Sequence, residues 1–142
     1  MKKIAILLFI ILSVTYSQKY IAVVNKTCLL YSISEYDVEQ LLLGKKLDLG
    51  VKTAVLSLFI PQQENVLDHF VGKSPKKFDK YWSKRIFSGK DGIKPEKFDD
   101  LRFLFSFIEK NVGAICILDA RTKVSQAIKD TYKNNIKFIA VH

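Results

Sequence analysis

The feature of this sequence that most limits its fold is the alternation of short apolar runs with segments of helical periodicity. Runs rich in β-branched and aliphatic residues are too short for buried helices and are typical of strands; they lie at Tyr20–Val24, Thr53–Phe59, Ala114–Leu118 and Ile136–Val141. Apolar residues recur at three- and four-residue spacing in the segments between them. The order β-α-β-α-α-α-β-α-β predicts a three-layer α/β domain, in which helices flank a small, largely parallel or mixed sheet.

Helix starts and stops divide the intervening segments. Ser34 is a predicted N-cap for a helix over 35–43, and Ser74 followed by Pro75 is the clearest helix start in the chain. Further helices are predicted over 65–71, from Asp99 or Asp100 to just before Gly113, and over 123–132. We expect a loop over 90–97.

The first residues have the pattern of an export signal. Lys2 and Lys3 precede an apolar run over 4–14, and small residues follow at Thr15 and Ser17. We expect cleavage after Ser17, which assigns residues 1–17 to a signal peptide and 18–142 to one domain in the periplasm or outside the cell. A membrane anchor is the alternative, but the run is shorter than the roughly 20 residues that a spanning helix needs. We therefore expect no stable anchor after cleavage.

The chain is basic but lacks the sequence pattern of a nucleic-acid-binding protein. The chain carries 23 basic and 14 acidic residues, and only Arg85, Arg102 and Arg121 among the basic ones are arginines. Readers of phosphates and base edges favour arginine forks and interleaved aromatic side chains, so we expect no nucleic-acid partner. The basic surplus is still able to attract small anions by long-range steering.

No pattern in the chain indicates catalysis. The sequence lacks a nucleophile elbow, a P-loop, a G-x-G-x-x-G run and an H-E-x-x-H helix. His69 follows Asp68 in a predicted helix, where a surface histidine is the simpler interpretation. With two cysteines and two histidines in the whole chain, we expect no structural metal site, no cofactor and no enzymatic activity.

The two cysteines leave two alternatives open. Cys28 follows the first predicted strand, and Cys116 lies in the middle of an apolar one. An exported chain with an even number of cysteines permits one disulfide between them. Buried unpaired thiols, which behave as small hydrophobic groups, are the other interpretation.

Several pieces in a fixed order resemble the small phosphate-transporter substrate-binding-like proteins. The segments that carry the resemblance are Gln40–Lys45, a strand leading into Pro61, Phe70 ahead of Gly72–Pro75, Tyr81-Trp82, Ile86–Lys90, Pro95, Asn111–Ile115 and a closing strand at Lys137–Val141. In that family the matching pieces are a helix ending in F-L-G-K, a K-S-P…Y-W…I-F-T-G-K helix and a strand entered through P-G-A-I-G-Y. They span about two thirds of residues 18–142.

The resemblance implies a fold similar to one lobe of a type II periplasmic binding protein. It also implies a module that holds a small anion weakly, or together with a partner or a second copy. On this basis the expected ligand-binding residues are Ser34, Gln62, Gln63 and Asn65. Glu64, in the same loop, opposes an anion by its charge. The alternative is an envelope interaction or accessory protein that uses the lobe as a scaffold and has no small-molecule ligand.

An aromatic stripe bears on that alternative. Phe103 and Phe107 share one side of a predicted helix, and Leu104, Phe105 and Ile108 share another. Exposed aromatic side chains on the first side would provide a docking surface for a partner. The simpler expectation is that the helix is sandwiched between neighbours and buries both sides.

Overall fold

The computed structural model describes residues 19–45, 48–50 and 54–142. The predicted signal peptide, its cleavage after Ser17 and the start of the strand predicted at Thr53 lie outside these residues. Among the described helices, none combines the length and apolar character needed to cross a membrane.

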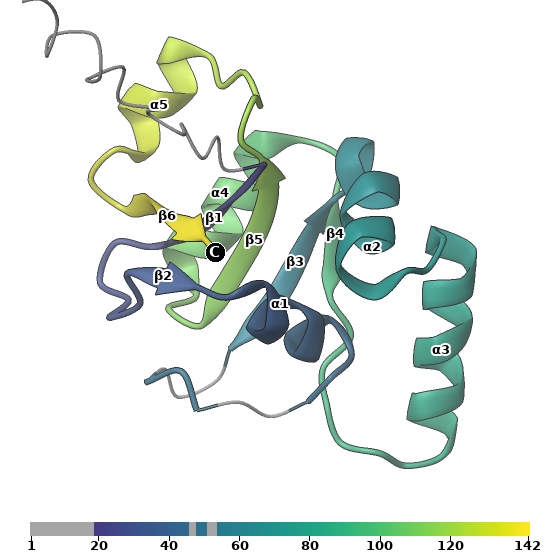
Figure 1. Ribbon diagram of the computed structural model, residues 1–142. Coiled ribbons are helices and arrows are strands. Elements are labelled where there is room, and N and C mark those ends of the chain that lie inside the picture. The colour runs from purple at the N-terminus through teal and green to yellow at the C-terminus, as the bar shows by residue number, and fades with distance from the viewer. Residues whose placement is uncertain (1–18, 46–47, 51–53) are drawn as a thin grey trace, which may run out of the picture.

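The described residues form an α/β domain around one six-stranded sheet (Figure 1). The elements in chain order are β1 (Tyr20–Asn25), β2 (Ser32–Ile33), α1 (Glu35–Leu42), β3 (Val55–Phe59), the 3-10 turn η2 (Ile60–Gln62), α2 (Gln63–Val71), α3 (Pro75–Phe87), β4 (Glu96–Phe98), α4 (Leu101–Lys110), β5 (Ala114–Asp119), α5 (Gln126–Tyr132) and β6 (Ile136–Val141). The four strands predicted from apolar runs are all present. The short strands β2 and β4 were not expected, and β4 occupies the end of the predicted loop over 90–97.

The sheet is mixed, as the expected fold class allows. Its strand order is β2-β6-β1-β5-β3-β4. Strand β1 is antiparallel to both of its neighbours, β5 and β6, whereas the pairs β2–β6, β5–β3 and β3–β4 are parallel. Five strands therefore end at the same edge of the sheet, and β1 alone begins there.

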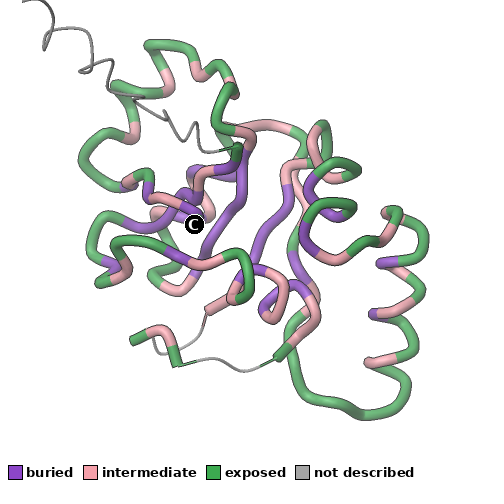
Figure 2. The backbone as a smooth tube through the Cα atoms, in the orientation of Figure 1, coloured by how far each residue is buried: buried purple, intermediate pink, exposed green. Residues whose placement is uncertain are grey.

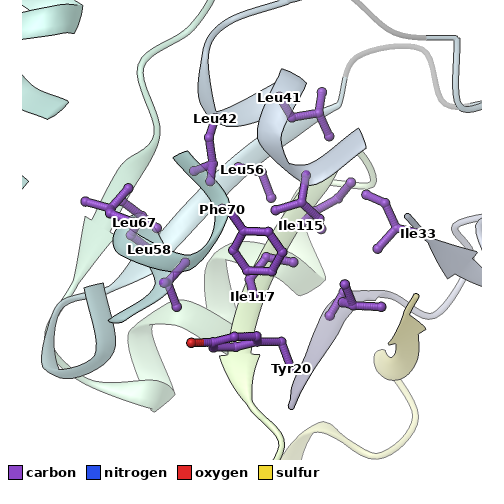
Figure 3. Close-up of a cluster of buried hydrophobic side chains, with 14 of the residues drawn as sticks. Tyr20, Ile33, Leu41, Leu42, Leu56, Leu58, Leu67, Phe70, Ile115 and Ile117 are labelled. Atoms are coloured by element: carbon purple, nitrogen blue, oxygen red, sulfur yellow. The ribbon is translucent and has the colours of Figure 1, made fainter. Parts of the chain in front are cut away.

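Helices on both faces of the sheet make the three layers that the sequence predicts. One face carries a core cluster with side chains from α1, α2 and α3, of which Figure 3 shows the part around Leu42, Leu67 and Phe70. Phe78 and Trp82 of α3 belong to the same cluster. The other face carries a cluster with Leu104, Phe105 and Ile108 of α4, against which α5 packs. Strand β5 serves both, because its alternating side chains point to opposite faces.

Local capping explains several helix boundaries. The Ser34 hydroxyl accepts a hydrogen bond from the Asp37 N–H at 3.0 Å, and the Ser74 hydroxyl accepts one from the Lys77 N–H at 3.2 Å. Asp100 caps α4 by accepting from the Arg102 N–H at 2.8 Å. These bonds satisfy N–H groups that have no partner inside the helix. The capping residue of α5 is Ser125, so this helix begins three residues later than predicted.

The aromatic stripe on α4 is not buried as a whole. Phe103 is 62% exposed, which overturns the expectation that both sides of this helix are covered. Phe107 is half-buried and packs on Phe98, with 5.2 Å between the ring centroids. The side of α4 that carries Leu104, Phe105 and Ile108 faces the sheet. Phe103 is on the side that faces solvent, and no described residue covers it.

The structure contains the two cysteines as free, buried thiols and not as a disulfide. Cys28 belongs to the cluster under α1 to α3, and Cys116 to the cluster under α4. The sheet lies between the two clusters, so the two side chains point into different cores. Burial raises the pKa of the Cys116 thiol far above its ordinary value, because the thiolate would be desolvated there.

We expect neither cysteine to be alkylated by iodoacetamide while the domain is folded, because the reagent attacks accessible thiolates. Both should react once the purified protein is unfolded in guanidinium, without added reductant. Intact-mass spectrometry under the two conditions measures this. A chain that gains two alkyl groups in denaturant only after reduction would restore the disulfide alternative.

Candidate functional site

The topology of the sheet indicates where a ligand would bind. After β3 the chain turns into α2, which packs on one face of the sheet, and after β5 it continues to α5, which packs on the other. Strands β3 and β5 are adjacent and parallel, so the loops that follow them diverge from the same edge. Such a topological switch point leaves a crevice in which ligands of open α/β sheets commonly bind.

A shallow depression of about 350 Å³ lies at this point, lined by Gln62, Asp119, Arg121 and Thr122. We call these four residues the switch-point site. The Gln62 side chain joins the two loops: its Oε1 accepts from the Asp119 N–H at 2.8 Å and its Nε2 donates to the Thr122 hydroxyl oxygen at 2.7 Å. The Thr122 hydroxyl donates in turn to the Asp119 carbonyl at 2.6 Å. The floor of the site is therefore held by side-chain hydrogen bonds.

Arg121 is the charged group that this site presents to solvent. Its side chain is 87% exposed, with Nε 3.2 Å from Oδ1 and Nη2 3.2 Å from Oδ2 of Asp119. Those hydrogen bonds hold the pKa of the Asp119 carboxyl below its usual range. Among the described residues, two of the five guanidinium N–H groups are used in this way, so three have no described partner and can meet a ligand.

Lys19 and Tyr20, at the start of β1, lie at the same end of the sheet as the switch-point site. Tyr20 pairs with Asp119 across β1 and β5, and the Lys19 ammonium lies 5.6 Å from the centroid of the Tyr20 ring. Burial raises the pKa of the Tyr20 hydroxyl, and the Asp119 charge raises it further. The neutral Tyr20 hydroxyl donates to the Asn65 carbonyl at 3.4 Å.

Of the four predicted ligand-binding residues, only Gln62 lines the depression. Ser34 caps α1, as described above. The Gln63 side-chain oxygen is buried without a hydrogen-bond partner among the described residues, and the Asn65 side chain is exposed. Sequence reasoning did not identify Asp119, Arg121 and Thr122. A polar run directly after a buried strand was the available signal, but its position beside Gln62 depends on the pairing of β3 with β5.

His69 lies between a carboxylate of α1 and two aromatic rings. Its Nε2 lies 2.6 Å from Oε1 of Glu35, and its ring packs on Tyr20 and Phe70 with centroid distances of 4.9 and 4.7 Å. No serine or cysteine is among its described hydrogen-bond partners. Within the described ranges, no three His, Cys, Asp or Glu side chains gather as metal ligands would.

Comparison of the chain with protein-family models and with curated proteins finds no match. The resemblance to small phosphate-transporter substrate-binding-like proteins therefore stays a prediction, and the function is inferred from the residues of the site.

Proposed function

We propose that this protein is an exported substrate-binding-like module, similar to one lobe of a periplasmic binding protein, that holds a small oxyanion weakly at the switch-point site. The observation that carries the proposal is the exposed Arg121 fork at the topological switch point of the sheet, three of whose N–H groups have no partner in the described part of the chain. A planar guanidinium matches the oxygens of phosphate or sulfate better than an ammonium does.

The charges around the site favour an anion but do not form a tight trap. Arg121 and Lys19 are positive, and the Asp119 carboxylate is negative. The formal charge of the chain is +9, or +7 (21 basic minus 14 acidic residues) without Lys2 and Lys3, and it steers anions toward the protein. Because the site is shallow and open to water, we expect a Kd on the order of 1 mM.

The test is a titration of the purified, isotope-labelled protein with phosphate and with sulfate, followed by amide chemical shifts at constant ionic strength. We expect saturable shifts at Arg121, Thr122 and Gln62, and their loss in Arg121→Ala. Arg102→Ala is a matched control, because Arg102 makes nearly the same bonds to Asp100, with Nε at 3.2 Å and Nη2 at 2.8 Å. Equal loss in the two variants, or no saturable shift with either anion, would contradict the proposal.

A second candidate function is an envelope interaction or accessory protein. Exposed apolar side chains favour it: Phe87 is 95% exposed at the end of α3, and Phe103 projects from α4. Two results together would favour this function over the first. A protein partner would shift the amide signals around Phe87 or Phe103, and neither phosphate nor sulfate would shift those of the switch-point site.

A further inference from the structure

A second hollow, separate from the switch-point site, lies between α5, α4 and β6. Its volume is about 390 Å³, within the range typical of small-molecule sites. It exists because α5 covers its part of the sheet loosely: this helix has no buried residue. Figure 2 shows the α5 region mainly exposed, in contrast to the buried strands β3 and β5.

The floor of this hollow is apolar. It is formed by Phe105, Val124, Ile136 and Phe138. Phe105 and Ile136 are buried in the core, whereas Phe138 is 47% exposed although it lies on a sheet strand. The Phe105 and Phe138 rings meet edge to face, with centroids 6.2 Å apart. A half-exposed aromatic ring continuous with the core is a surface that a ligand is able to cover.

The rim of the hollow is positively charged. Lys26, Lys129 and Lys133 line it, and within the described ranges their ammonium groups take part in no ion pair or side-chain hydrogen bond. The acidic groups nearby on the chain are bonded to amides instead: Asp130 accepts from Gln126 at 2.9 Å and Glu109 from Asn135 at 3.0 Å.

Lys137 also lines the hollow, but its charge is engaged elsewhere. Its ammonium donates to the Cys28 carbonyl and lies 4.4 Å from the centroid of the Tyr31 ring. The positive rim therefore consists of Lys26, Lys129 and Lys133, and we call the whole site the lysine-rimmed hollow.

We propose that the lysine-rimmed hollow binds a small amphipathic organic anion, with its apolar body on the phenylalanine floor and its acidic group at the lysines. A medium-chain fatty acid has this chemistry. An inorganic anion would leave the floor in water, and a neutral apolar molecule would leave the lysines without a partner. The two complementary features in one hollow select a ligand that combines both.

The primary experiment is a calorimetric titration of the purified protein with hexanoate, octanoate and decanoate below their micelle concentrations, with decanol as the uncharged probe. We expect saturable binding that tightens by up to about fourfold for each CH₂ that the floor buries, a ratio equivalent to about 0.8 kcal/mol. Decanol should bind more weakly than decanoate. Absence of saturable decanoate binding, or equal binding of decanol, would overturn the proposal.

Variants assign the binding to this hollow. The double change Lys129→Ala/Lys133→Ala should weaken decanoate about fivefold, since each exposed charge contributes modestly. Lys76→Ala/Lys77→Ala removes the same charge from exposed positions on α3 and should leave the affinity unchanged. Phe138→Ser should weaken binding about tenfold, whereas Phe103→Ser removes an exposed ring outside the hollow and should not. An equal effect of a variant and its control would overturn the assignment.

The outcome is independent of the oxyanion proposal. Arg121→Ala should not change decanoate affinity, and saturating phosphate should not displace decanoate, because the switch-point site and the lysine-rimmed hollow share no lining residue. If Phe138→Ser loses the wild-type circular dichroism spectrum, the comparison of Lys129→Ala/Lys133→Ala with Lys76→Ala/Lys77→Ala still tests whether decanoate binds in this hollow. An acidic peptide that binds while decanoate does not would show that the site takes a protein segment, and would also overturn the proposal.

Discussion

Replacing Trp82 with alanine is expected to lower the free energy of unfolding by about 3–5 kcal/mol. The Trp82 side chain is fully buried in the cluster under α1 to α3, at 0% exposure. Its indole N–H donates to the Leu42 carbonyl at 3.0 Å. The change leaves a large cavity and also removes this hydrogen bond, and the second loss adds to the first.

Urea unfolding followed by circular dichroism measures this effect, because Trp82 is the single tryptophan and its removal abolishes the fluorescence signal. Phe87→Ala is the matched control: the same helix, an aromatic residue, but an exposed side chain. It should change stability by no more than about 0.5 kcal/mol. A Trp82→Ala protein as stable as Phe87→Ala would mean that α3 does not pack on the domain as described.

Gly44→Ala is expected to cost about 2–5 kcal/mol, from two causes. Gly44 has a φ of +80°, where a side chain costs about 1–2 kcal/mol. A Cβ at this position would also lie 2.6 Å from Cη2 of Trp82 and 2.8 Å from Nε of Arg85. Arg85 is held there by hydrogen bonds to the Gly44 and Asp91 carbonyls, so it does not yield freely. Overpacking of this kind adds about 1–3 kcal/mol.

Gly89→Ala separates the two causes. Gly89 has a similar φ of +71°, but a Cβ at this position would meet no atom within 4 Å, so only the backbone cost applies. In the Trp82→Ala background, the added cost of Gly44→Ala should fall toward that of Gly89→Ala, because the indole ring is gone. Equal costs for the two glycines in the wild-type background would contradict the close approach of Gly44 to Trp82.

The apolar faces were predictable because periodicity reports burial directly. Val38, Leu41 and Leu42 of α1 and Val66, Leu67 and Phe70 of α2 are buried as their spacing indicates. The short strands β2 and β4 were not predictable in this way. With two and three residues, they have too few alternating positions to leave a pattern, and they exist through their pairing with β6 and β3.

The candidate site was predictable only in part. Gln62 follows β3 in the sequence, so the loop that contains it was identifiable as a functional candidate. Its partners Asp119 and Thr122 are 57 and 60 residues away along the chain. Nothing in either segment alone indicates that the other lies beside it.

Local sequence patterns were enough to specify the longer strands and helices, the helix starts at Ser34 and Ser74, and the cover of helices on both faces of a sheet. The strand order, the reversed direction of β1, the meeting of Gln62 with Asp119 and the lysine-rimmed hollow became visible only in three dimensions. This division arises because strands pair through main-chain groups that every residue type but proline supplies. Side-chain patterns therefore specify which face of a strand is buried, whereas the neighbour of each strand is set by packing of the whole chain.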